Sequence, residues 1–177
     1  MRVIDAQRVP ADGPLVVASN HISYLDPVAL GSACPRPISY MAKVELFAIP
    51  VLGPLIEGLE AYPVDRNRGD VAAIKRSVKI LQEGRAVGIF PEGGRNLDGT
   101  AVPKTGAVLL ASMAGAPLVP AAIGGTRNPR SLGRITVVFG EPMEILRDRK
   151  ARGDDLEKWT RELMRRIAAL KETIGAN

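Results

Sequence analysis

The chain contains one histidine, His21, in the stretch "ASNHISYLDP". Asp26 lies five positions after it, and an apolar run, Leu15 to Ala18, comes just before it. A histidine titrates near neutral pH and can take a proton from a hydroxyl, and a nearby carboxylate can fix its tautomer. The stretch therefore fits a catalytic pair. It also fits a structural histidine beside a helix that starts at Asp26-Pro27, because Asp is common at an N-cap and Pro at the first helical position.

Further residues that could take part in binding or catalysis follow other apolar runs. "YPVDR" carries Arg66, and "PEGGRN" carries Glu92, Gly93, Gly94 and Arg95. "PKTGA" then supplies Lys104 at a predicted helix start. In parallel α/β sheets, binding sites form in loops at the carboxyl ends of strands, so we expect these groups to meet at one edge. Each also has a structural interpretation. Gly93 and Gly94 fit a tight turn, Lys104 fits a solvated surface lysine, and Arg66 fits a weak surface ion pair.

The elements that must position these residues alternate between short apolar strands and amphipathic helices. "AVGIF" and "LVPAAI" are typical of strands buried on both faces of a mainly parallel sheet. The predicted strands are Leu15 to Ser19, Ile38 to Ala42, Glu60 to Val64, Ala86 to Phe90, Leu118 to Ile123 and Ile135 to Phe139. The predicted helices are Asp70 to Glu83, Gly106 to Ala114 and an amphipathic one from about Asp154 to Ile174. The fold class is α/β, one domain over residues 1–177 with a central sheet flanked by helices.

Composition narrows the classes of function. The 24 Lys and Arg outnumber the 19 Asp and Glu, so the formal charge is +5, which suits nucleic acid, an anionic membrane surface or a phosphorylated substrate. Aromatic residues make up 4%, which disfavours recognition of nucleic acid by base stacking. A single cysteine, Cys34, excludes an internal disulfide and a Cys-rich zinc site and suggests a reducing, cytosolic environment.

Common catalytic motifs are absent from the sequence. It has no G-x-S-x-G elbow, no G-x-x-x-x-G-K-[ST] loop and too few histidines for H-E-x-x-H, and no spacing suggests a metal site. The N-terminus has no apolar segment typical of a secretory signal. What remains is a His–Asp pair without a protein nucleophile, which favours a base that activates the hydroxyl of a substrate.

Four motifs in order resemble those of the glycerolipid acyltransferases, the lysophosphatidate (1-acyl-sn-glycerol-3-phosphate) acyltransferase family. "NHISYLDP" is similar to the family's N-H-x-x-x-x-D motif and "FPEGGRN" to its F-P-E-G-T-R-S motif. "YPVDR" resembles the arginine-bearing motif between them, and "LVPAAI" resembles the later V-P-V-x-I strand. The resemblance covers about residues 14–125. Two positions depart from the pattern, since Gly94 replaces Thr and Asn96 replaces Ser.

The resemblance implies transfer of an acyl group from a thioester, acyl-CoA or acylated carrier protein, to the free hydroxyl of 1-acyl-glycerol-3-phosphate, which gives phosphatidic acid. His21 would be the general base, oriented by Asp26, with no acyl-enzyme and no cofactor. Lys43 and Pro120 are further candidates for contacts with the oxyanion or the donor. The residues expected to bind the phosphate or the acceptor are Asn20, Arg66, Glu92, Gly93, Gly94, Arg95 and Lys104.

The acceptor is a lipid, so we expect peripheral contact with the inner face of the cell membrane from the cytoplasm. The uncharged stretch from Leu46 to Ile56 is expected to line an acyl groove, to lie in the bilayer interface, or to be a core segment. Other acceptor lipids and a non-catalytic module that binds lipid or phosphate are the alternatives. Nucleic acid is not an expected partner.

Overall fold

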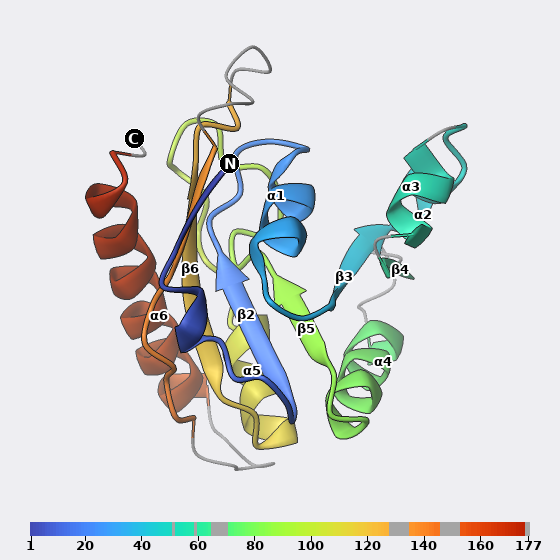
Figure 1. Ribbon diagram of the computed structural model, residues 1–177. Helices are drawn as coiled ribbons and strands as arrows, with labels where there is room; N and C mark the ends of the chain where they lie inside the picture. Colours follow the sequence, from blue (N-terminus) through green and yellow to red (C-terminus); the bar gives the residue numbers. More distant parts are fainter. Residues whose placement is uncertain (51, 59, 65–70, 128–134, 146–152, 176–177) are drawn as a thin grey trace.

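The strands of the protein form one sheet in the computed structural model, which describes residues 1–50, 52–58, 60–64, 71–127, 135–145 and 153–175. The seven strands within these ranges lie in the order β1-β7-β6-β2-β5-β3-β4 (Figure 1). Their bounds are β1 Arg2–Ile4, β2 Leu15–Ser19, β3 Ile38–Lys43, β4 Tyr62–Val64, β5 Ala86–Ile89, β6 Leu118–Gly124 and β7 Thr136–Phe139. The central strands β2, β5 and β6 are buried along their whole length, as their apolar sequences predict.

The sheet is mainly parallel. β2 pairs in parallel with both β5 and β6, and β3 pairs in parallel with β5 and β4. β7 runs antiparallel to β6, and β1 adds to β7 in parallel. Because β2, β5 and β6 point the same way, the loops that follow them meet at one edge of the sheet, at the upper end of Figure 1. The α/β fold with a mainly parallel sheet is confirmed.

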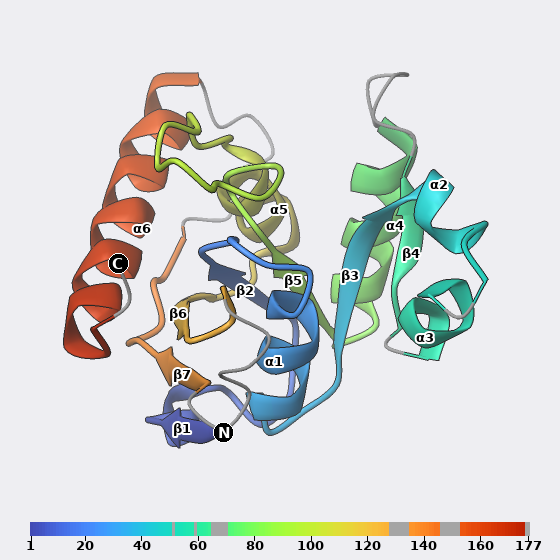
Figure 2. The same ribbon diagram turned by 90° about the horizontal axis from the view of Figure 1, so that it is seen from above.

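Helices cover both faces of the sheet (Figure 2). The helices are α1 Asp26–Ala33, α2 Val44–Phe47, α3 Leu52–Gly58, α4 Val71–Gln82, α5 Gly106–Ala114 and α6 Gly153–Thr173, with a short 3-10 helix, η1, at Ala6–Arg8. Leu81 of α4, Leu110 of α5 and Leu163 of α6 belong to one core cluster. Leu30 of α1 belongs to the cluster on the other face, together with Phe139 of β7. The sheet is thus the middle of three layers.

Several element boundaries follow from single residues. Gly84 has φ +75, and the N–H groups of Gly84 and Arg85 donate to the carbonyls of Leu81 and Ile80. This is a glycine-ended helix terminus, and it agrees with the predicted helix end at Glu83. The predicted first residue of this helix, Asp70, lies outside the described residues. The predicted strand start at Glu60 is wrong, because Glu60 has φ +57, and β4 begins at Tyr62.

The stretch after β3 folds into two short helices, α2 and α3, beside β4 (Figure 1). In the uncharged stretch that begins at Leu46, Ile49 is 44% exposed, Ala48 and Pro50 are exposed, and Leu46 and Phe47 are only partly buried. The alternative that this uncharged stretch is simply a core segment is therefore wrong for its described first half. A groove and an interfacial contact both stay open.

Within the described residues, no helix combines the length and the apolar character that crossing a membrane requires. The uncharged stretch from Thr105 to Thr126 contains α5 and β6 instead, separated by Gly115 in the left-handed conformation. This is the helix, turn and strand that the sequence predicts.

Candidate functional site

His21, in the loop between β2 and α1, lies in contact with Asp26, the first residue of α1. The ring Nδ1 of His21 is 3.0 Å from Oδ2 of Asp26. The His21 side chain is 15% exposed and the Asp26 side chain is fully buried. An ionised carboxylate only accepts hydrogen bonds, so Nδ1 carries the proton and Nε2 is the basic nitrogen. No described residue bonds to Nε2, which leaves it available to a substrate hydroxyl.

Described residues give the carboxylate of Asp26 four hydrogen bonds. Its Oδ2 accepts from the backbone N–H groups of Ile22 at 2.6 Å and Ser23 at 2.7 Å, besides His21. Its Oδ1 accepts from the Thr126 hydroxyl at 2.6 Å. Asp26 is therefore not the N-cap that the Asp-Pro sequence suggests. The cap position belongs to Leu25, and the carboxylate turns back toward the loop that carries the histidine.

The His21 ring also rests on an aromatic neighbour. Phe90, directly after β5, stacks against it with ring centroids 4.3 Å apart and an interplanar angle of 23°. The backbone of His21 is tied to the next loop at both ends. Its N–H donates to Oε2 of Glu92 at 2.7 Å, and its carbonyl accepts from the N–H of Asn96 at 2.7 Å. The loops after β2 and β5 are thus locked together.

Glu92 and Asn96 shape the loop after β5. The second carboxylate oxygen of Glu92 accepts from the Asn96 side chain at 3.2 Å, and the Asn96 side-chain oxygen accepts from the N–H of Ala101 at 3.2 Å. Both oxygens of Glu92 are therefore occupied by the protein. Its contact with the substrate stays a prediction, because each carboxylate oxygen can accept a further hydrogen bond.

Gly93 and Lys104 lie against each other at the turn that starts this loop. Gly93 has φ +70, and a Cβ at its position would lie 2.9 Å from Cε of Lys104. Only glycine fits here without strain and without displacing the lysine. The N–H of Gly93 donates to the carbonyl of Phe90 at 2.9 Å, so it closes the turn and is not a spare donor for phosphate. The N–H of Gly94, in contrast, donates to no described residue.

Arg95 and Tyr24 form an exposed pair across the two loops. The Arg95 guanidinium carbon lies 3.8 Å from the centre of the Tyr24 ring. Its Nη2 donates to the tyrosine hydroxyl at 3.0 Å. Neither Arg95 nor Lys104 forms an ion pair with a described residue, so both cations are available to an anion.

Asn20 has a structural place that differs from the predicted contact with the substrate. It is 2% exposed. Its amide donates to the carbonyl of Ile123 at 3.0 Å and accepts from the N–H of Ile123 at 2.8 Å. The side chain thus bonds to the β6 backbone just beyond the last residue of β2. It fixes the position of His21 next to it.

The remaining predicted contact residues, Lys43, Pro120 and Arg66, lie in different places. Lys43 is exposed and is the last residue of β3. Pro120 is buried inside β6, with its ring beside Gly140 and its carbonyl accepting from the N–H of Gly140 at 2.7 Å. The contact of Pro120 with the donor or the oxyanion stays a prediction, and its buried place inside β6 gives it no support. Arg66 lies outside the described residues.

The sequence did not predict a role for two residues near the His21–Asp26 pair, called the dyad below. Thr126 is separated from Asp26 by 100 positions. Its only link to the site in the sequence is that it follows a predicted strand, at the edge of the sheet where the loops after β2, β5 and β6 meet (the site edge). Tyr24 stands inside the histidine motif, but nothing in the sequence pairs it with Arg95. Cys34 lies at the far end of α1 from the dyad, and burial raises the pKa of its thiol, so it stays neutral.

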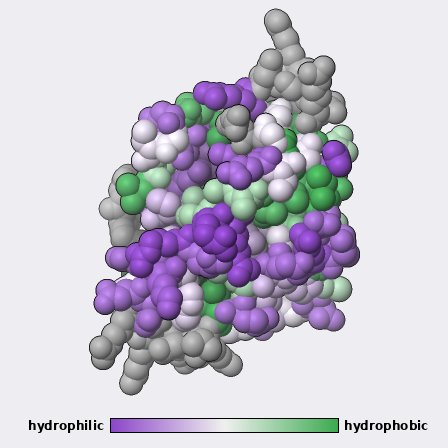
Figure 3. Space-filling view, turned by 90° about the vertical axis from the view of Figure 1, so that its left-hand side faces the viewer, coloured by the Kyte–Doolittle hydropathy of each residue, from purple (hydrophilic) through white to green (hydrophobic). Residues whose placement is uncertain are grey.

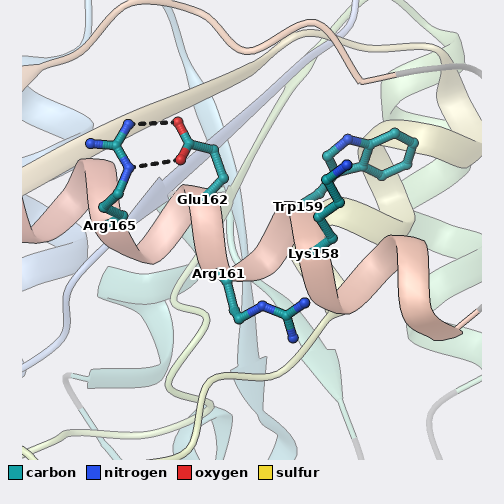
Figure 4. A pocket seen from close by; sticks show the side chains of 5 residues that line it. All are labelled: Lys158, Trp159, Arg161, Glu162 and Arg165. Carbon is teal, nitrogen blue, oxygen red and sulfur yellow. Dashed lines mark hydrogen bonds and ion pairs between the residues drawn. The ribbon is translucent and has the colours of Figure 1, made fainter.

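The surface depression on α6 is unrelated to this chemistry. It encloses about 420 Å³ and is lined by five residues of that helix (Figure 4), Lys158, Trp159, Arg161, Glu162 and Arg165. The helix packs on the core cluster opposite the His21 face. Its outer side is largely hydrophilic (Figure 3), as expected of a solvated basic face. Elsewhere in the described ranges, no three His, Cys, Asp or Glu side chains gather as a metal would require.

Comparisons with known proteins agree with the geometry. Residues 1–124 match the family model described as Acyltransferase. The 1-acyl-sn-glycerol-3-phosphate acyltransferase of Bacillus subtilis is 39% identical over 81% of this chain and 73% of its own length. That of Borreliella burgdorferi is 31% identical over 71% of this chain and 52% of its own length.

A solved structure shares the fold. The crystal structure of the 1-acyl-sn-glycerophosphate acyltransferase PlsC from Thermotoga maritima matches with a TM-score of 0.72 and 27% identity, over 96% of this chain and 71% of that one. The family match spans more than half of the chain and includes both loops that hold His21, Asp26 and Arg95. This chain belongs to the acyltransferase family, among relatives that are 1-acyl-sn-glycerol-3-phosphate acyltransferases.

Proposed function

We propose that this enzyme transfers a fatty acyl group from a thioester to the free hydroxyl of 1-acyl-glycerol-3-phosphate and so forms phosphatidic acid. The observation that carries the proposal is the buried Asp26 carboxylate 3.0 Å from the only histidine in the sequence, next to a loop whose Arg95 and Lys104 form no ion pair with any described residue. The names of the relatives from Bacillus subtilis and Thermotoga maritima support the acceptor.

His21 acts as the general base in this proposal. Its Nε2 takes the proton of the acceptor hydroxyl as the oxygen attacks the thioester carbonyl. The tetrahedral intermediate then breaks the carbon–sulfur bond, and the leaving thiolate takes the proton back from His21. The products are an ester and a free thiol, with no acyl group on the protein. Asp26 keeps Nδ1 protonated and stabilises the imidazolium between the two steps.

The phosphate of the acceptor binds to the loop after β5. Arg95 offers a planar set of donors that suits phosphate, and Lys104 adds a point charge. The N–H of Gly94, which has open space at its Cα, completes the set. Arg66 is a further proposed phosphate ligand from the sequence motif.

The oxyanion of the intermediate requires a donor as well. Lys104 is the first candidate, because its side chain lies over Gly93 in the loop that also contacts His21. Lys43, at the carboxyl end of β3, is the second. The donor is acyl-CoA or an acylated carrier protein, acting as a cosubstrate, and no cofactor is needed.

The lipid acceptor implies that the site edge approaches a membrane. Leu97 is 54% exposed and Val102 is 82% exposed, and both lie in the loop that carries Arg95 and Lys104. Aliphatic side chains beside cations suit the interface of an anionic bilayer. We therefore propose peripheral binding of this loop to the inner face of the cell membrane.

The experiment is an acyl-transfer assay of the purified protein. Lysophosphatidate is compared with monoacylglycerol, which lacks the phosphate, and each is offered with acyl-CoA and with acylated carrier protein. We expect preference for lysophosphatidate and a rate loss of about 10²–10⁴ for His21→Ala. Arg161→Gln on α6 is the matched control for Arg95→Gln, since both remove one exposed arginine.

Three outcomes would contradict parts of the proposal. A His21→Ala variant with turnover near that of the wild type would remove the general base. Equal use of the acceptor without phosphate would remove the assigned roles of Arg95 and Lys104. Preference for another lysophospholipid, offered as a third acceptor in the same assay, would replace lysophosphatidate as the acceptor and leave the role of His21 intact.

A further inference from the structure

The hydrogen bond from Thr126 to Asp26 joins two distant parts of the chain at the dyad. Its length is 2.6 Å, and it spans 100 positions in the sequence. Thr126 is 1% exposed and Asp26 is fully buried. Thr126 follows β6, after Gly125 with φ +83 turns the chain back toward α1. A hydroxyl bonded to a charged group inside the protein is a strong contact.

Thr126 differs from the other three partners of Asp26 in the part of the chain it comes from and in the carboxylate oxygen it bonds to. Ile22, Ser23 and His21 belong to the loop that leads directly into Asp26, and all three bond to Oδ2. Among the described residues, only Thr126 bonds to Oδ1 and only Thr126 comes from another element. The loop alone therefore fixes one oxygen, and Thr126 fixes the other.

The second oxygen matters because the terminal torsion of an aspartate is soft. With a donor on Oδ1, rotation of the carboxylate would cost a buried hydrogen bond. Without that donor, the plane of the carboxylate can turn, and its bond to Nδ1 of His21 weakens. The His21 tautomer with the proton on Nδ1, which leaves Nε2 as the base, is then no longer favoured over the other tautomer.

We propose that Thr126 is a positioning residue of the dyad, which holds the Asp26 carboxylate in the plane that fixes the His21 tautomer. The consequence for catalysis rests on the proposed function of His21 as general base. The alternative is that the hydroxyl merely satisfies a buried oxygen and leaves His21 unaffected.

The chain offers an unusually direct test, because His21 is its only histidine. A sample with ¹⁵N-labelled histidine gives the two ring nitrogens of one residue, and their chemical shifts report the tautomer. The full chain is compared with Thr126→Val, which keeps the shape and loses the hydroxyl, and with Thr126→Ser, which keeps the hydroxyl. Thermal unfolding of each variant checks that it is folded.

We expect the wild type and Thr126→Ser to have the proton on Nδ1 and Thr126→Val to have a mixture of tautomers. We also expect kcat to fall about tenfold in Thr126→Val, as for other partners that orient a functional histidine, with KM for lysophosphatidate little changed. Thr126→Ser should restore kcat. If Thr126→Val does not fold, Thr126→Ala takes its place in the same comparison.

The NMR result separates this inference from the proposed function. If the wild type transfers no acyl group, the tautomer comparison still decides the role of Thr126. A folded Thr126→Val variant with the wild-type tautomer would overturn the inference. So would equal loss of kcat in Thr126→Val and Thr126→Ser, because the hydroxyl would then not be the active feature.

Discussion

Arg95 rests on an exposed aromatic ring, and this contact has a consequence for substrate binding. Tyr24 is 65% exposed and gains little from burial, but it supplies a ring face at 3.8 Å and a hydroxyl at 3.0 Å to Arg95. We predict that Tyr24→Ala raises KM for lysophosphatidate about 2- to 5-fold, from the loss of an exposed cation–π contact, and leaves kcat nearly unchanged. Steady-state kinetics on the purified enzyme measures both.

Tyr24→Phe is the graded variant for this prediction, because it keeps the ring and loses the hydroxyl. Its KM should lie between those of the wild type and Tyr24→Ala. The KM for monoacylglycerol should not respond to either change. A drop in kcat with constant KM would instead place Tyr24 in the chemical step.

At the scale of single residues, the sequence predicted contacts that are local. His21 and Asp26 are five positions apart, so the sequence offered them as a possible pair, and the family resemblance favoured that interpretation over a helix cap. Thr126 is not predictable in this way, since its contact depends on β6 and β2 being neighbours. The substitution of the family's Ser by Asn96 shows the same limit, because its bonds to Glu92 and Ala101 depend on the fold of a whole loop.

Packing between elements also makes a prediction, at Gly88 of β5. A Cβ at Gly88 would lie 2.3 Å from the Tyr40 ring of β3 and 2.8 Å from Ile38. We predict that Gly88→Ala lowers the free energy of unfolding by about 1–3 kcal/mol, because the overlap forces the ring to move. Chemical denaturation provides the measurement. Gly153→Ala, at the start of α6 with open space around it, is the control and should change stability little.

Stability should depend on pH through Glu162 of α6. Hydrogen bonds from Arg165 and Arg166 lower the pKa of its carboxyl from 4.5 to about 2. A carboxyl with a lowered pKa stabilises the folded state above its unfolded pKa, and the contribution disappears as the pH falls toward about 2. We predict that Glu162→Gln has a lower Tm than the wild type near neutral pH and that the two converge in acid.

Glu157→Gln is the matched control on the same helix, since its ion pair with Arg161 is longer, at 3.7 Å. It should lower Tm less than Glu162→Gln does. A difference between Glu162→Gln and the wild type that is constant with pH would contradict the assigned cause.

Elements were predictable where apolar pattern and glycine agree, as for β2, α5 and the end of α4. The sequence did not indicate β1, because Arg2–Ile4 is short and mostly exposed, and it becomes a strand only by pairing with β7. Glu60 looked like the start of a strand, but its left-handed backbone ended that pattern. Propensity thus decided the central elements, and tertiary pairing decided the edges.

At the scale of the whole molecule, the site edge combines positive charge and exposed aliphatic side chains. We predict that the protein floats with anionic vesicles and binds neutral ones weakly. A Leu97→Ser, Val102→Ser double variant should bind anionic vesicles about tenfold more weakly. Val71→Ser, at a residue 62% exposed on α4, is the control and should bind as the wild type does. If the protein binds neither anionic nor neutral vesicles, the proposed membrane contact is contradicted.

The four partners of Asp26 also separate folding from chemistry. Removal of the His21 ring takes away one of these partners and leaves the buried carboxylate with three protein donors. Removal of the Asp26 carboxylate leaves the buried Thr126 hydroxyl and two backbone N–H groups without their acceptor, which is the costlier loss. A His21 variant is thus the cleaner instrument for dissecting the reaction, whereas an Asp26 variant reports a mixture of lost turnover and lost native population.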